Sequence, residues 1–344
     1  MFFYLFILTV LTYLVNEFLF KKKLLISITG DVHQKFASYS EVPLTGGFFI
    51  FFGILYFFSK DASLFIFFSF TILILGFVSD LKFIKSASSR FLWQTILVII
   101  FVASSDMQLN ETRIILLDKI LSQNIINYIF LTFCILILMN GSNFIDGLNT
   151  LSIGYYLLIS IVLAYIISDQ EIILNYIPIE YLVSLLICIF ILNAKNKIYL
   201  GDSGSYLLGF IFATFLIDIY NSNKNISPFF IVLLLWYPCY ENLFSIIRKR
   251  ILQRSPMAPD TNHFHQLIFF MVKKKYKYKI FYANFITSQI INFYHLIIFS
   301  IAANFIRNTE IQIFLILLNI FVYTIIYFKA FFLNIVEEQV IYKI

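Results

Sequence analysis

Residues 125–167 read IINYIFLTFCILILMNGSNFIDGLNTLSIGYYLLISIVLAYII. The stretch contains two apolar runs, 125–139 and 151–167, separated by the polar cluster Asn140–Thr150. A helix that crosses a bilayer needs ~20 residues, so the run 125–139 is short by itself and is supported by the charge distribution of the whole chain. A charged residue at the centre of the hydrocarbon costs ~3 kcal/mol. The stretch therefore predicts two membrane-spanning helices joined by a polar turn, and it makes that turn a candidate functional site.

The composition extends this interpretation to the whole chain. Of 344 residues, 60% are hydrophobic and 13% are charged, and the mean hydropathy is +0.88, which excludes an ordinary soluble domain. We expect an all-α polytopic membrane protein with about ten or eleven transmembrane helices, forming one integral-membrane domain over residues 1–344. The expected spans lie near 2–20, 44–59, 62–78, 91–105, 125–139, 151–167, 179–192, 205–219, 228–247, 280–305 and 311–328.

The distribution of basic residues predicts the orientation of these spans. The first apolar run has no basic residue before it and is followed by Lys21, Lys22 and Lys23, which indicates an uncleaved first span with its N-terminus outside. With that orientation, 20 of the 25 lysines and arginines fall in cytoplasmic segments, as the positive-inside rule requires. The net charge of +6 then reflects lysines and arginines at an anionic membrane surface, and no nucleic-acid partner is expected.

This orientation places five polar stretches on the cytoplasmic side, namely 31–47, 79–90, 140–149, 193–205 and 248–266. Asn140, Asn143 and Asp146 are spaced i, i+3, i+6, so they lie along one side of a helix if the span continues, and Gly147 marks its end. Two amides and a carboxylate are suitable ligands for a hard cation and hydrogen-bond partners for a sugar or phosphate. The alternative is a polar cap at the membrane interface.

A second polar stretch, Gly201–Ser205 (GDSGS), opens the span near 205–219. A helix N-terminus presents free N–H groups to an anion, and Asp202 could hold Mg²⁺ against that same anion. The alternative is that its Asp and Ser are ordinary helix N-caps.

A further polar stretch carries ionisable residues. Asp260, His263 and His265 lie in a loop rich in basic residues, including Arg254, and their spacing suits a phosphate site better than a zinc site. The alternative is a juxtamembrane basic loop with incidental histidines.

Two acidic residues lie in or next to predicted spans. Asp80 stands at the cytoplasmic end of the third span, where a lone Asp is usually an interfacial residue. Glu241 lies inside the ninth span and is expected to be buried and either functional or paired.

Taken together, the polar stretches resemble the motifs of the polyprenyl-phosphate N-acetylhexosamine-1-phosphate transferases, glycosyltransferase family 4. The matching motifs occur in order within residues 31–265, followed at 266–344 by a cytoplasmic basic segment and the last two spans. They are QKF (34–36) with VPLTGG (42–47), GFVSDLK (76–82), NGSNFIDGLN (140–149), LGDSGS (200–205) and PDTNHFH (259–265).

The resemblance implies an enzyme of the bacterial cytoplasmic (inner) membrane. Such an enzyme passes a sugar 1-phosphate, of the N-acetylhexosamine type, from a UDP-sugar to undecaprenyl phosphate. The reaction releases UMP and forms the lipid-linked diphosphosugar that starts a cell-envelope polysaccharide such as lipopolysaccharide O-antigen. The expected cofactor is Mg²⁺, with Mn²⁺ as an alternative, and the expected partners are the two substrates and the lipid bilayer, with a homodimer left open.

The resemblance also implies roles for individual residues. It makes Asp202 and Asn143 the ligands of the metal ion on the UDP diphosphate. It places four residues in the catalytic centre, namely Asp80, Asp146, His263 and His265. It assigns substrate binding to Lys35, Asn140, Asn143, Arg254 and Asp260.

The chain departs from the family pattern at three positions. Ser79 stands where the first of two adjacent carboxylates is common, and Ala37 and Gln266 stand where the family often has histidines. The serine motivates a second hypothesis, a catalytically impaired relative that acts as a scaffold. A secondary transporter would have a similar number of spans, but it would place its polar residues near the midplane of the membrane.

Overall fold

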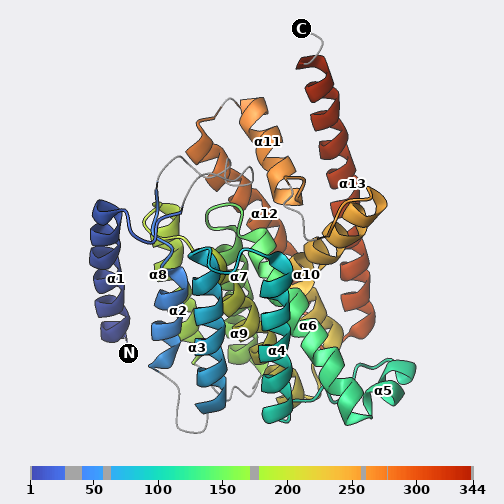
Figure 1. Cartoon of the computed structure of the whole chain (residues 1–344). Coiled ribbons are helices and arrows are strands. Elements are labelled where there is room, and N and C mark those ends of the chain that lie inside the picture. Colours follow the sequence, from blue (N-terminus) through green and yellow to red (C-terminus); the bar gives the residue numbers. More distant parts are fainter. Residues whose placement is uncertain are drawn as a thin grey trace.

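The structure, a computed structural model, describes residues 2–27, 41–56, 63–170, 178–256, 261–276 and 278–341. Within those ranges the chain is helical, and the β pairing is limited to an isolated bridge between Ile26 and Pro43. The helices are α1 (Phe2–Lys22), α2 (Gly46–Leu55), α3 (Ser63–Asp80), α4 (Ala87–Ser104), α5 (Ile115–Leu121), α6 (Asn124–Ile145), α7 (Leu151–Gln170), α8 (Ile179–Ala194), α9 (Gly201–Ser222), α10 (Pro228–Ile251), α11 (Phe264–Tyr276), α12 (Ile280–Ala303) and α13 (Thr309–Ile341) (Figure 1).

The predicted fold class is confirmed. Among the described residues, nine helices are long and apolar enough to cross a membrane, and α2 and α8 are shorter apolar helices, so each of the eleven predicted spans corresponds to a helix. The predicted bounds were too narrow where polar residues continue a helix: α6 runs to Ile145, and α9 begins at Gly201. The two short helices α5 and α11 were not predicted, because each lies in a segment interpreted from its polar residues as a connection.

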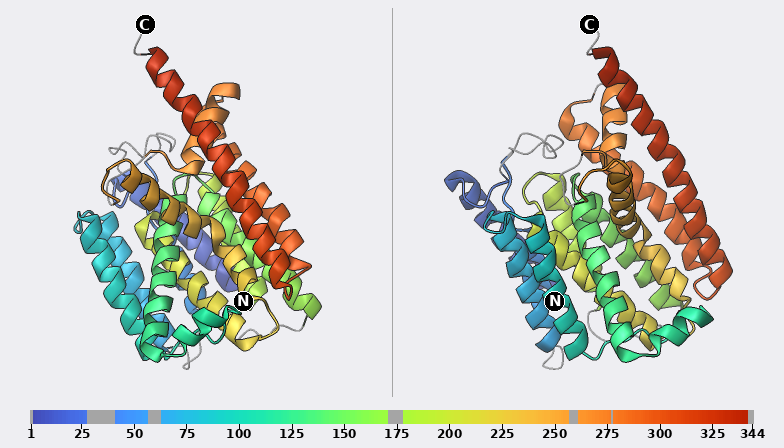
Figure 2. Two further views of the ribbon diagram at one scale, coloured as in Figure 1. Left: turned by 90° about the vertical axis from the view of Figure 1, so that its right-hand side faces the viewer. Right: turned by 45° about the vertical axis from the view of Figure 1, so that its right-hand side comes forward.

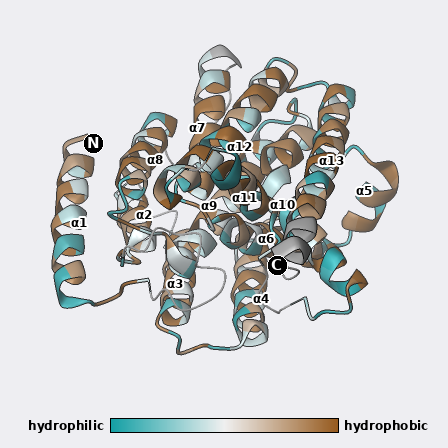
Figure 3. Ribbon diagram, turned by 90° about the horizontal axis from the view of Figure 1, so that it is seen from above, coloured by the Kyte–Doolittle hydropathy of each residue, from teal (hydrophilic) through white to brown (hydrophobic). Residues whose placement is uncertain are grey.

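Helix α9 forms the centre of the bundle. Nearly all of its residues from Ser203 to Tyr220 are buried, and α2, α3, α6 and α10 pack around it (Figure 3). The closest approach is to α3, where a Cβ on Gly76 would lie 2.4 Å from the Cα of Ser203. Only glycine permits this contact, and it brings the end of α3 against the beginning of α9.

All the polar motifs in the described part of the chain gather at one end of the bundle. Because successive long helices run in alternate directions, the segments that follow α1, α3, α6, α8 and α10 lie at this end, which we call the site end (Figures 1 and 2). Helix α13 projects beyond the bundle at the same end, whereas α5 and the N-terminus lie at the opposite end. The shared location of the motifs is confirmed, and the assignment of this end to the cytoplasm stays a prediction.

The VPLTGG motif joins this group through backbone hydrogen bonds. Tyr199 N–H donates to Pro43 O at 2.9 Å, and Gly46 N–H donates to Tyr199 O at 3.0 Å. The segment that leads into α2 is thereby paired with the segment that leads into α9.

Candidate functional site

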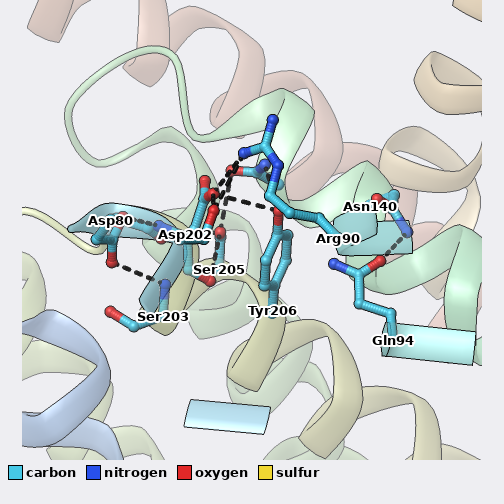
Figure 4. A network of polar contacts seen from close by, with 11 residues as sticks. Asp80, Arg90, Gln94, Asn140, Asp202, Ser203, Ser205 and Tyr206 are labelled. Atoms are coloured by element: carbon cyan, nitrogen blue, oxygen red, sulfur yellow. Dashed lines mark hydrogen bonds and ion pairs between the residues drawn. The ribbon is translucent and has the colours of Figure 1, made fainter. Parts of the chain in front are cut away.

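The core of the site is the junction between the end of α3 and the beginning of α9. The carboxylate of Asp80 accepts hydrogen bonds from the backbone N–H groups of Asp202 at 2.8 Å and Ser203 at 3.1 Å (Figure 4). Gly201 has a φ of +66°, and a Cβ there would lie 2.7 Å from Asp80 Oδ2, so this turn requires glycine. Asp80 therefore caps α9 from another helix.

This cap corrects one sequence-based expectation. The α9 N-terminus was expected to offer free N–H groups to an anion, but two of them are already bonded to Asp80. Asp80 also holds the turn that carries Asp202, and its place in the catalytic centre stays a prediction. The sequence could not show this cap, because the two residues are 122 positions apart.

Asp202 forms an ion pair with Arg90, the second element of the site. Arg90 Nη1 lies 2.8 Å from Asp202 Oδ2, and the Ser79 hydroxyl donates to the same oxygen at 2.5 Å. The Tyr206 hydroxyl also donates to it, at 3.3 Å (Figure 4). These contacts all end on Oδ2, so within the described ranges the second oxygen of Asp202 is available to a ligand. Arg90 also keeps a buried Nε–H that has no partner in the described part of the chain.

Helix α6 supplies the third side of the site. Asn143 Oδ1 accepts from the Ser205 hydroxyl at 3.1 Å, which joins the end of α6 to the first turn of α9. Asn140 donates to Gln94 Oε1 at 2.9 Å, which joins α6 to α4 (Figure 4). Asp146, which was predicted to lie on the same helix, follows directly after its last residue, Ile145.

The site contains more negative than positive charge. Asp80, Asp146 and Asp202 lie close enough to interact, and Arg90 forms an ion pair with Asp202. Burial, together with the nearby carboxylates of Asp202 and Asp80, raises the pKa of the Asp146 carboxyl well above its usual range. A bound cation would relieve this repulsion.

The oxygen donors of the site would suit a magnesium ion that is also bound by substrate phosphates and water. Among the described residues no three His, Cys, Asp or Glu side chains are arranged to enclose a metal. Mg²⁺, however, is usually held by one or two carboxylates plus substrate phosphates and water. The open oxygen of Asp202, with Asn143 and Asp146 beside it, suits that shared arrangement rather than a closed cage.

Both predicted histidines lie against the end of α6. The His263 ring packs on Phe144 at 5.0 Å between centroids, and His265 lies so close to Gly147 that a Cβ there would be 2.3 Å from His265 Nε2. His265 is fully buried, and neither ring nitrogen has a partner among the described residues. Burial, with His263 nearby, lowers the pKa of His265 to about 3, so the ring is neutral at physiological pH.

Of the other predicted substrate-binding residues, the structure describes only Arg254. Arg254 is exposed in the segment between α10 and α11, and its backbone N–H donates to Lys249 O. Lys35 and Asp260 lie outside the described residues, so their predicted roles stay predictions.

Comparisons with known proteins match the part of the chain that contains most of this site. The family model described as Glycosyl transferase family 4 matches residues 62–220, which include Arg90, Asp146 and Asp202. This segment, a little under half of the chain, is similar to glycosyl transferase family 4. The matched segment ends before α10, so both histidines lie beyond it.

Curated relatives in the family carry consistent names. A Bacillus subtilis (strain 168) protein named probable undecaprenyl-phosphate N-acetylglucosaminyl 1-phosphate transferase is 28% identical over 200 residues, which cover 57% of this chain and 55% of the relative. Undecaprenyl-phosphate alpha-N-acetylglucosaminyl 1-phosphate transferases of Thermotoga maritima and Salmonella typhi are 26% and 23% identical, over 39% and 77% of their lengths. The chain thus matches about half the length, or less, of the first two.

Sequence reasoning missed Arg90, Gln94 and Tyr206 as site residues. A signal was present for the first two, because an arginine and a glutamine spaced i, i+4 interrupt the apolar face of α4. A basic residue within a spanning helix is a functional candidate by default. Tyr206 carries no such signal, since tyrosine is common in this chain.

Proposed function

We propose that this protein transfers a sugar 1-phosphate, of the N-acetylhexosamine type, from a UDP-sugar to undecaprenyl phosphate. The observation that carries the proposal is the group of three carboxylates and one arginine at the end of a membrane bundle, on the motifs shared with family 4. A diphosphate donor supplies negative charge that Arg90 and a divalent cation would offset. A lipid acceptor explains why the site lies where spanning helices end.

The proposed reaction is a single displacement. A phosphate monoester with a second pKa of ~6 is largely dianionic at neutral pH, so its oxygen can attack phosphorus without a protein base. The attacked phosphorus is the one that carries the sugar, and the bond that breaks joins it to the bridging oxygen of UMP. Asp80 accepts a backbone hydrogen bond from α9 on each of its oxygens, which suits a positioning role for Asp80 in this scheme.

The residues of the chain then act by position and charge. Arg90 has spare N–H donors for a phosphate oxygen, and Asp202 holds it in place through one carboxylate oxygen. Asp202, with Asn143, would hold Mg²⁺, which when bound neutralises charge on the diphosphate. The neutral His265 ring can form a hydrogen bond with the donor without adding charge. Phosphoryl transfer depends mainly on such positioning and electrostatics.

The nucleotide product tests the reaction class. We expect purified protein to release UMP stoichiometrically from a UDP-N-acetyl sugar in the presence of undecaprenyl phosphate, with a rate that rises with pH through ~6 and then levels off. Chromatography of the nucleotides across a panel of UDP-sugars measures this. Release of UDP would mean transfer of the sugar alone, and no nucleotide release from any donor would favour the scaffold hypothesis that Ser79 motivates.

We also propose that the site end faces the cytoplasm, where UDP-sugars are present. In a cysteine-free background, Cys introduced at the exposed Ser255 should resist an impermeant thiol reagent in intact cells and react after permeabilisation. Cys introduced at the exposed Ser122, at the opposite end, should react in intact cells. The reverse labelling pattern would refute the orientation.

A further inference from the structure

Glu241 is a buried carboxylate that the reaction scheme above does not use. It lies in the middle of α10, close to Pro238, and is 1% exposed. Its Oε1 lies 2.9 Å from His263 Nδ1 and accepts from Phe264 N–H at 3.2 Å, and its Oε2 accepts from the Tyr323 hydroxyl at 2.7 Å. One side chain thus joins α10, the beginning of α11 and α13.

The bonding pattern indicates that Glu241 is ionised. The N–H of Phe264 and the hydroxyl of Tyr323 are donors, so both carboxylate oxygens act as acceptors. A buried charge is energetically costly unless it is paired and hydrogen-bonded. Apolar side chains could hold the same helices together at a lower cost in free energy. A full set of donors around a carboxylate at this depth therefore suggests a role beyond holding helices together.

The same bond fixes the orientation of His263. Because Nδ1 faces a carboxylate, the proton of the ring lies on Nδ1, and Nε2 is directed away from Glu241. The ring packs on Phe144, between Asn143 and Asp146 in sequence, and lies parallel to the His265 ring at 5.9 Å and 12°. Glu241 thus holds His263 against the end of α6, although within the described ranges Glu241 itself makes no contact with Asp202.

We propose that Glu241 is a positioning residue for the sugar-phosphate donor: by accepting the Nδ1 proton of His263, it directs Nε2 toward the bound donor. The proposal rests on the proposed function. The proposal also assigns a function to α13, because the hydroxyl of Tyr323 holds the other carboxylate oxygen of Glu241. Glu241 and Tyr323 both lie outside residues 62–220, the segment that matches the family model. A carboxylate that sets the tautomer and direction of an active-site histidine is a recurrent arrangement in enzymes.

Kinetics of three variants test this role. Glu241→Gln keeps the size of the side chain, so the melting temperature should stay near that of the wild type. The neutral amide, however, no longer fixes the proton of His263 on Nδ1 as a carboxylate does, so kcat/KM for the UDP-sugar should fall by ~10–100-fold. Tyr323→Phe leaves the contacts of Glu241 Oε1 with His263 and Phe264 in place, so it should lower kcat/KM less than Glu241→Gln does. The control, Tyr294→Phe, removes a phenol bond between α12 and Asn319 of α13 and should change neither kcat nor KM.

A second measurement does not depend on turnover. Diethyl pyrocarbonate modification of His263, located by peptide mass spectrometry, should be slow in the wild type, because the ring is 7% exposed and held by Glu241. It should accelerate several-fold in Glu241→Ala and remain slow in Tyr294→Phe. If the wild type released no UMP but this difference held, the proposed reaction would fail while the positioning of His263 stood.

The outcome for the glutamine variant decides the inference. A purely structural Glu241 predicts that the isosteric amide restores both stability and kinetics. Glu241→Gln with wild-type kcat and KM, or Glu241→Ala with wild-type reactivity at His263, would overturn the proposal.

Discussion

Asp202→Asn should leave the protein folded and lower turnover by at least ~100-fold, the scale typical of losing a key electrostatic group in an active site. The amide is isosteric and can still accept from the Ser79 hydroxyl and from Arg90, so the turn at the start of α9 should persist. What is lost is the negative charge that would hold a divalent cation on the donor diphosphate. UMP release at saturating substrates and at several Mg²⁺ concentrations measures the effect.

Asp106→Asn provides the matched control, because this exposed carboxylate lies at the opposite end of the bundle and accepts from Gln108. It should keep wild-type turnover. If Asp202→Asn retained near-normal activity at matched expression, the assignment of Asp202 to the metal would be wrong.

The fold could be predicted from the sequence because each span is encoded locally. An apolar run in a membrane must satisfy its own backbone hydrogen bonds, so length and hydropathy alone indicate the helices. The predicted helix ends were wrong where polar residues follow an apolar run. The polar composition of Asn140–Ile145 indicated the end of the span at residue 139, yet these residues continue α6. Those residues remain helical because their polar side chains find partners on α4 and α9.

The candidate site could be predicted only in part, since it depends on contacts between distant segments. The motifs indicated Asp202, Asn143, Asp146 and the two histidines, and the structure brings these residues to one end of the bundle. That Asp80 caps α9 was not predictable, because an interfacial Asp and a helix cap have the same local sequence. The expectation that Glu241 is buried and paired was confirmed, although its partners on α11 and α13 could not be named in advance.

The structure shows the contacts of Ser79, the residue that departs from the family pattern next to Asp80. Its hydroxyl donates to Asp202 Oδ2 and accepts from Arg90 at 3.2 Å. A carboxylate at that position would face Asp202 at hydrogen-bond distance and add repulsion. The serine therefore favours the ion pair of Arg90 and Asp202 while leaving the rest of the site intact.

Arg90→Gln should be the second severe variant, with kcat/KM for the UDP-sugar lowered by ~100-fold and a raised KM. The change removes the cation paired with Asp202 and leaves three neighbouring carboxylates without it. Breaking a partly buried ion pair strands the remaining charge, so some loss of stability should accompany the kinetic effect. Arg90→Lys should recover part of the rate, because an ammonium keeps the charge but lacks the planar donors of the guanidinium.

Arg113→Gln separates these two effects. Arg113 lies at the opposite end of the bundle, where it donates to Thr309 Oγ1 at 2.8 Å, to Ile226 O at 3.1 Å and to Arg307 O at 3.2 Å. Its loss should lower the melting temperature, since it joins the loops before α10 and α13, while the KM for the UDP-sugar stays at the wild-type value. If Arg90→Gln changed only stability, as Arg113→Gln should, then Arg90 would be a structural partner of Asp202, and the donor diphosphate would have to bind elsewhere.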